Sequence, residues 1–160
     1  MKGIKTLVSF TAIAVCLGAA SMVNAATITP VNTTFSAPGT ITVKSPASFN
    51  LPVTCNITFT GKTAADGSSA SITAATVSGS NSLCGVPVMQ NLPWTLTPTS
   101  TSTATVAGVS FSVISNCGTA TINTNYGGGA LTVPSAQAVG SCSITALNVA
   151  PSPTFVITNP

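Results

Sequence analysis

The chain has 160 residues, of which only 3% are charged, against about a quarter in an ordinary globular protein. It contains four Lys or Arg, one Asp or Glu and no His, and its formal net charge is +3. This composition argues against nucleic acid as a partner, because phosphate recognition depends on clustered lysine and arginine. It also argues against an enzyme, since acid–base and nucleophilic catalysis need titratable groups that this chain nearly lacks.

The N-terminus has the features of a secretory signal. Lys2 and Lys5 precede a continuous apolar stretch, and small side chains surround Ala25, where a signal peptidase would cut. We therefore expect a signal peptide at 1–25 and a single secreted β domain at 26–160. Cleavage would lower the formal charge from +3 to +1, because both lysines leave with the signal.

An alternative interpretation makes Cys16 a lipidated residue, since the residues just before it loosely resemble a lipoprotein cleavage box. Val15 is bulky for the position before such a cysteine, which favours ordinary signal cleavage. No later stretch approaches the ~20 apolar residues that a membrane-spanning helix needs. We therefore expect an exported chain without a transmembrane segment, located extracellularly or at the cell surface. The signal alone does not distinguish these locations from the periplasm.

Short runs of alternating apolar and polar residues recur along the rest of the chain and predict β-strands. Threonine mixed with valine and isoleucine is typical of sheets, and glycine, proline or aspartate separates the runs. No window has the 3.6-residue apolar period of an amphipathic helix. The expected strands are 26–30, 40–44, 53–60, 69–77, 103–106, 108–114, 119–123, 130–133, 141–147 and 154–158.

About ten short strands in one domain predict an all-β fold, an antiparallel β-sandwich with a β-barrel as the alternative. Trp94 is expected to be buried, with a partner for its indole N–H. The faces opposite the core carry threonine, serine and asparagine, as in VTCNITFTG at 53–61, which gives a polar but uncharged exterior. The expected core consists of Val53, Ile57, Phe59, Ile72, Val109, Phe111, Val113, Ile122, Ile144, Phe155 and Ile157.

Four cysteines remain after the signal, and an even number in an exported chain indicates disulfides. Three pairings are open to four cysteines. Cys55 and Cys142 lie in alternating runs, whereas Cys84 and Cys117 are each followed by glycine. Each strand-type cysteine thus has a turn-type cysteine nearby, which predicts bridges between Cys55 and Cys84 and between Cys117 and Cys142.

The remaining candidates for chemistry are few. There is no histidine, and the cysteines lack the C-x-x-C spacing typical of zinc sites, so we expect no metal and no cofactor. Asp66 is the only side-chain carboxylate, and its setting in GKTAADGSS predicts a solvated turn residue. The sequence therefore predicts a protein without a catalytic site.

A series of short segments resembles one known family. In chain order they are SMVNAAT, VTCNITFTG, NLPW, AGVSFSV, NCGT and GSCSITALNVAPSP. Together they resemble the small secreted protein activators of alkane oxidation (PraB-like) over nearly the whole secreted chain. The resemblance implies a secreted, non-catalytic protein that promotes growth on long-chain alkanes, by surface activity or by hydrocarbon contact at the cell exterior.

A second hypothesis follows from the charge-poor strands. Strand edges without lysine and a net charge near zero favour edge-to-edge pairing. The chain would then be a self-assembling extracellular subunit, fimbria-like or part of a biofilm-matrix filament, with residues 26–43 or 154–158 as a strand donated to a neighbour. The alternative for these segments is pairing within the chain's own sheet. The expected partners are therefore hydrocarbon or an oil–water interface, or other copies of the chain.

Overall fold

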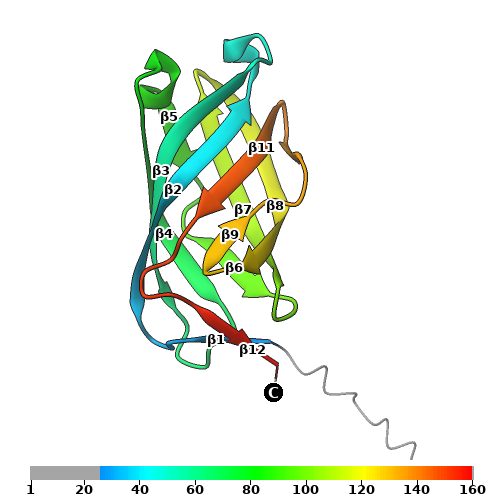
Figure 1. Ribbon diagram of the computed structural model, residues 1–160. Helices are drawn as coiled ribbons and strands as arrows, with labels where there is room; N and C mark the ends of the chain where they lie inside the picture. The colour runs from blue at the N-terminus through cyan, green and yellow to red at the C-terminus, as the bar shows by residue number, and fades with distance from the viewer. Residues whose placement is uncertain (1–25, 160) are drawn as a thin grey trace, which may run out of the picture.

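The computed structural model describes residues 26–159, so the predicted signal peptide lies outside the described residues (Figure 1). This part of the chain is all-β, as predicted, and its two short 3-10 helices are η1 (Pro46–Ser48) and η2 (Ser82–Gly85). The strands are β1 (Thr27–Thr29), β2 (Thr34–Lys44), β3 (Pro52–Thr63), β4 (Ala70–Ser78), β5 (Pro87–Gln90), β6 (Trp94–Pro98), β7 (Thr103–Val113), β8 (Ser115–Gly127), β9 (Ala130–Thr132), β10 (Gln137–Val139), β11 (Cys142–Val149) and β12 (Val156–Thr158).

Eight of the strands close into an antiparallel barrel. The hydrogen-bonded order is β11, β2, β3, β4, β6, β7, β8 and β9, and β9 pairs again with β11. The all-β class is confirmed, and the arrangement is the barrel, which the sequence gave as the alternative to the sandwich. Alternation of apolar residues cannot separate the two, because both bury one face of every strand.

The predicted core lies inside this barrel, except for Phe155 and Ile157, which lie at the end covered by β1 and β12. Ten of its eleven residues are buried, and the eleventh, Val53, is half-buried and faces the interior. Trp94 is 3% exposed, and its Nε1 donates to the backbone oxygen of Gln90 at 2.8 Å, so the predicted burial and indole partner are confirmed. Burial of this kind contributes about 1.5–3 kcal/mol per large apolar side chain.

Three strands were not predicted, namely β5, β6 and β10. All are short, and proline begins β5 and ends β6, which weakens the strand signal. Conversely, the runs 103–106 and 108–114 belong to one strand, β7. The separator between them is a β-bulge, with Gly108 at φ 81° and a register shift between Val106 and Val109.

The two ends of the barrel differ. One end is covered by the ribbon of β1 and β12, so the first and last strands of residues 26–159 pair with each other within the molecule. There the Tyr126 hydroxyl donates to the backbone oxygen of Phe155 at 2.6 Å, and the Phe155 ring meets Phe35 edge to face. The opposite end carries η1, η2 and the turn between β7 and β8 (Figure 1). We call this opposite end the helical end.

Candidate functional site

The barrel wall is split at two places near the helical end. β5 and β6 share one edge of β7, and β6 pairs with β4 only over Ala70–Ile72. In the same way, β9 and β10 share one edge of β11. In the described part of the chain, therefore, no ladder joins β5 to β4 or β10 to β8. The wall at these two places is held by contacts other than backbone pairing.

The four cysteines lie at these two places. The sulfur atoms of Cys55 and Cys84 are 1.96 Å apart, and those of Cys117 and Cys142 are 2.06 Å apart. The first pair lies between β3 and η2, which leads into β5, and the second lies between β8 and β11, beside β10. The structure thus brings together the cysteines that the sequence paired. Covalent bridges there remain a prediction, for which peptide mapping without reduction is the test.

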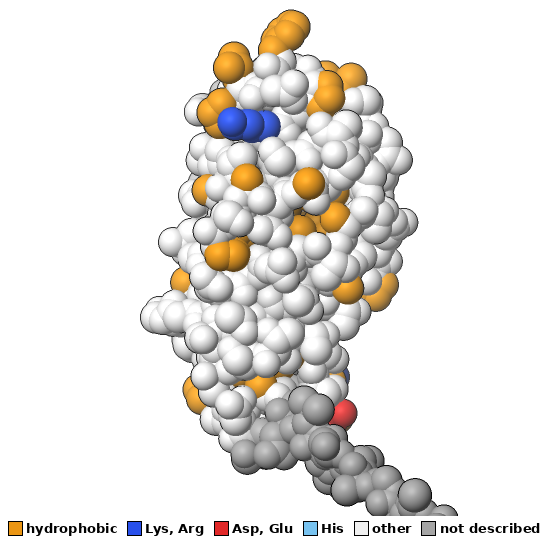
Figure 2. Space-filling model, turned by 90° about the vertical axis from the view of Figure 1, so that its right-hand side faces the viewer, with side chains coloured by type: hydrophobic (Ala, Val, Ile, Leu, Met, Phe, Trp, Pro, Cys, Tyr) orange, Lys and Arg blue, Asp and Glu red, His pale blue; other side chains and the backbone are white. Residues whose placement is uncertain are grey.

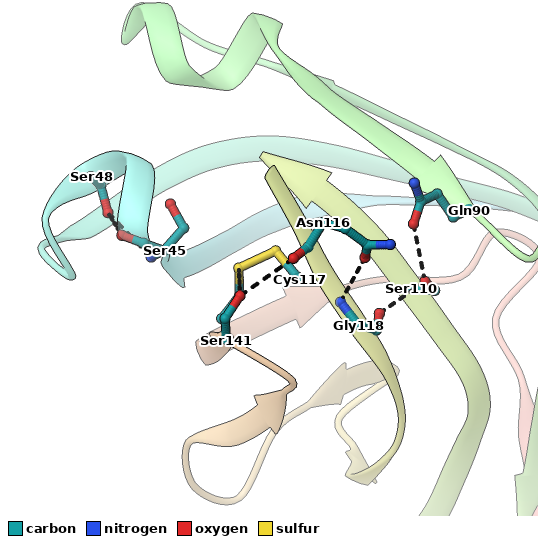
Figure 3. The surroundings of a disulfide bond; sticks show 9 residues. Ser45, Ser48, Gln90, Ser110, Asn116, Cys117, Gly118 and Ser141 are labelled. Atoms are coloured by element: carbon teal, nitrogen blue, oxygen red, sulfur yellow. Dashed lines mark hydrogen bonds between the residues drawn. A yellow bond between two sulfur atoms is a disulfide. The ribbon is translucent and has the colours of Figure 1, made fainter. Parts of the chain in front are cut away.

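The second cysteine pair sits in a tightly packed turn. Figure 3 shows Asn116, Cys117 and Gly118 beside Ser141, whose backbone N–H donates to the Cys117 oxygen at 2.8 Å. Gly140, the residue before Ser141, has φ 56°, and a Cβ on Gly140 would overlap the Cys117 carbonyl oxygen. Only glycine satisfies both the left-handed conformation and this close approach.

The interior of the barrel holds an apolar cavity of about 70 Å³. Its walls are inward-facing side chains of nearly every barrel strand, and the only hydroxyl groups among them belong to Ser45 and Thr124. The Thr124 hydroxyl is satisfied, since it donates to the Ala104 backbone oxygen at 3.0 Å. No charged side chain lines the cavity. Such a space is suited to an apolar, uncharged molecule and not to an ion.

The cavity opens toward the helical end. Its lining residues near the β1–β12 ribbon are buried, whereas those nearer the helical end include half-exposed ones. The half-exposed members of the lining are Val43, Val53, Val77, Leu83, Pro87 and Met89.

Exposed apolar side chains border this opening, and we call them the apolar rim. They come from the loop after η1, the segment after η2 and the β7–β8 turn, which the strand register places at the same end. Figure 2 shows apolar side chains standing out at this end, at the top of the view. The members are Phe49 (88% exposed), Leu51 (64%), Val86 (39%), Val88 (60%) and Ile114 (77%).

Two members of the rim lie on unfavourable backbone. Phe49 has φ 54° at the C-cap of η1, and Ile114 has φ 67° at the tip of the β7–β8 turn. The left-handed region suits glycine or asparagine, and a β-branched residue there is an outlier. Such strain costs of order 1–3 kcal/mol and clusters at functional sites. Two large apolar side chains are thus displayed to solvent at an energetic cost to the fold.

The predicted solvated role of Asp66 is confirmed. Its carboxylate is fully exposed and accepts hydrogen bonds from the Ser68 backbone N–H at 3.0 Å and the Ser68 hydroxyl at 2.8 Å. The backbone hydrogen bond is the main reason why the pKa of Asp66 is below its ordinary value. Burial acts in the opposite direction on Tyr126, whose pKa is raised. Neither group lies in the lining of the cavity.

Two features are absent from residues 26–159. They contain no group of three or more His, Cys, Asp or Glu that could hold a metal ion. None of the helices they form has the length and apolar character needed to cross a membrane.

Fold and site together define a small, charge-poor β-barrel with an apolar interior that opens at an apolar rim. The profile of the family described as "Alkane oxidation protein activator PraA/PraB-like" matches residues 1–159. The chain therefore belongs to this family, and the resemblance seen in its segments is confirmed. The family is named for an activator and not for an enzyme. Comparisons with curated proteins and with solved structures found no significant match.

The sequence identified the cysteines and the core but not the rim. Rim residues lie outside the alternating runs or at their ends, where an apolar residue carries no periodic signal. The sequence contains one local signal for Phe49. This residue lies between Pro-Ala-Ser and Asn-Leu-Pro, and a loop of this composition rarely contains an aromatic residue.

Proposed function

We propose that the protein is exported after removal of residues 1–25 and acts outside the inner membrane as a non-catalytic activator of growth on long-chain alkanes. It makes direct contact with hydrocarbon at the oil–water boundary. The apolar rim is the observation that carries this proposal, because it is a group of large apolar side chains that the fold leaves in water at one end of the barrel.

The charge distribution supports adsorption at oil. Within residues 26–159 the charged side chains are Lys44, Lys62 and Asp66, so the approach of the protein to hydrocarbon dehydrates few ions. Removal of rim side chains from water is favourable at about 1.5–3 kcal/mol for each fully exposed one. The exposed fractions of Phe49, Leu51 and Ile114 equal a little more than two such side chains. These three residues would then contribute about 3–7 kcal/mol to adsorption.

The cysteine pairs fit an exported protein, since disulfides persist in oxidising compartments. They hold the wall at the helical end, where the rim segments are attached. Bridges at these positions would keep the rim in place at an interface, where many proteins lose their packing. The proposed role needs no reacting group, in keeping with an activator that delivers or disperses hydrocarbon for another protein to oxidise.

Interfacial tension tests the proposal. Purified residues 26–160 should lower the tension of a hexadecane–water interface, and a rim variant with Phe49→Ser, Leu51→Ser and Ile114→Ser should need at least 100-fold more protein for the same effect. The matched control replaces exposed valines at the other end of the barrel, Val31→Ser and Val156→Ser. Equal activity of the rim variant and the wild-type protein would refute the rim as the contact surface.

A second candidate function is self-assembly into extracellular filaments, and β12 is the feature that favours it. β12 pairs only with β1, so its outer edge has no ladder in the described chain, and Val156 on it is 55% exposed. Electron microscopy of the same proteins separates the two functions. Regular fibres that disappear in the Val31/Val156 variant, with no interfacial activity in the wild-type protein, would favour assembly over hydrocarbon contact.

A further inference from the structure

The wall of the barrel has a gap between β4 and β5. β6 pairs with β4 only as far as Ile72, so the stretch of β4 from Ala74 to Ser78 has a ladder with β3 alone. On the other side of the gap, β5 has a ladder with β7 alone. Within residues 26–159, side chains rather than backbone hydrogen bonds therefore fill the space between β4 and β5.

Four of the six half-exposed residues that line the cavity lie beside this gap. Of these, Val77 belongs to β4, Leu83 to η2, and Pro87 and Met89 to β5. All four are apolar and border the gap. A molecule that enters between β4 and β5 would pass from solvent into the interior without meeting a charged or unsatisfied polar side chain.

The size and chemistry of the cavity restrict what can enter. At about 70 Å³ it has roughly half the volume of the engineered cavity of about 150 Å³ that admits benzene. A whole long alkane does not fit, and a ring or branched group is too wide. The tip of an unbranched chain is slim enough. The lining offers no cation for a carboxylate, and its hydroxyls are those of Ser45 and of Thr124, which already donates to the Ala104 oxygen, so an ionised head group would be left without a counter-charge inside.

We infer that the barrel binds the methyl end of an unbranched alkane, which enters through the gap between β4 and β5 while the rest of the chain stays outside at the apolar rim. This inference rests on the proposed hydrocarbon contact and adds a selective site to it. The rim would hold the oil surface without discrimination, and the gap would admit single linear chains. The protein would thereby withdraw one alkane molecule at a time from the oil.

Trp94 provides a built-in reporter of binding. It is the only tryptophan, it is buried, and it lines the cavity. Bromine is close to a methyl group in size, so the brominated end of 1-bromohexane can enter in place of a methyl end, and it should then quench the Trp94 fluorescence by contact. We expect saturable quenching by 1-bromohexane and little quenching by 1-bromoadamantane, which is too bulky for the gap. The absence of saturable quenching by 1-bromohexane, or equal quenching by both probes, would overturn the inference.

Substitutions on one strand locate the entrance. Val77→Phe should fill the gap and weaken quenching by 1-bromohexane at least tenfold, whereas Thr76→Phe, on the outward face of β4, should leave it unchanged. Circular dichroism shows whether each variant folds. If Val77→Phe fails to fold, Val77→Ala decides, because a wider gap should make 1-bromohexane quench Trp94 more strongly than in the wild-type protein, whereas 1-bromoadamantane stays too large for the cavity. Unchanged quenching in a folded Val77→Phe protein, or in Val77→Ala, would contradict this entrance.

The same Val77→Phe protein tests the internal site independently of the proposed contact at the oil surface. Its rim is intact, so it should still lower the tension of the hexadecane–water interface as the wild-type protein does. Interfacial activity without quenching in the wild-type protein would refute the internal site alone. Quenching without interfacial activity would refute the proposed contact at the oil surface alone.

Discussion

Replacement of Ile114 by asparagine should stabilise the fold while it weakens hydrocarbon contact. At φ 67°, an isoleucine costs about 1–2 kcal/mol relative to ordinary backbone, and asparagine tolerates this conformation. The side chain is 77% exposed, so the burial lost on substitution is only about 0.5 kcal/mol. The net expectation for Ile114→Asn is a gain of about 0.5–1.5 kcal/mol in the free energy of unfolding.

Urea denaturation measures the stability, and the tension of a hexadecane–water interface measures the contact. At a slope of about 2 kcal/mol per molar urea, the expected gain raises the midpoint by about 0.3–0.7 M. Asparagine at this largely exposed rim position should also reduce adsorption. Thr76→Asn on the barrel wall is the control, and it should not reduce adsorption. A lower midpoint for Ile114→Asn would refute the strain argument, and unchanged adsorption would refute a role for Ile114 in the rim.

Other predictions follow from the cysteine pairs, one turn and the titratable groups. Cys55→Ala with Cys84→Ala opens a loop with a sequence separation of 29 residues, and urea denaturation should show a loss of about 3.6 kcal/mol; a loss below about 1 kcal/mol would contradict a bridge there. Gly140→Ala should cost at least about 2 kcal/mol in the same assay, because alanine meets both positive φ and a backbone oxygen; a neutral result would contradict the close approach. Tyr126→Phe should cost about 1–3 kcal/mol, since it leaves a buried carbonyl without a partner. The raised pKa of Tyr126 means that wild-type stability is complete below the ordinary tyrosine pKa of about 10 and falls above it, and this alkaline loss should be absent in the variant. The pKa of Asp66 is lowered, so its small contribution is present above its ordinary pKa of about 4 and is lost as the pH falls through the folded value. Thermal melts should therefore be flat between about pH 5 and 7, below the range in which the α-amino group at residue 26 titrates, and a transition within that window would contradict the assignment of titrating groups.

The strands and the core were predictable because a half-buried strand must alternate. VTCNITFTG lies in β3 as expected, with Ile57 and Phe59 inward and with Asn56 outward. The proximity of the paired cysteines was also predictable from the sequence, because each strand-type cysteine had a turn-type neighbour in the chain. Local patterns were sufficient where local geometry decides the structure.

Such local patterns could predict neither the closure of the barrel nor the apolar rim. The pairing of β11 with β2 joins segments far apart in the sequence, β11 also pairs with the nearby β9, and nothing in these segments specifies which edge each one meets. The same holds for the gap beside β5, which depends on where β6 stops pairing with β4. Phe49 and Ile114 matter through their positions at one end of the closed barrel, and only the fold brings them to the same end.

Growth on hexadecane tests the central claim most directly. Cells that lack this protein, grown on hexadecane as the only carbon source, should be restored by added purified residues 26–160 and by the Val31→Ser, Val156→Ser control. The Phe49→Ser, Leu51→Ser, Ile114→Ser protein should not restore them, and growth on a soluble carbon source should be the same with all three. Full restoration of growth on hexadecane by the folded rim variant would contradict the claim that the protein contacts hydrocarbon through the apolar rim.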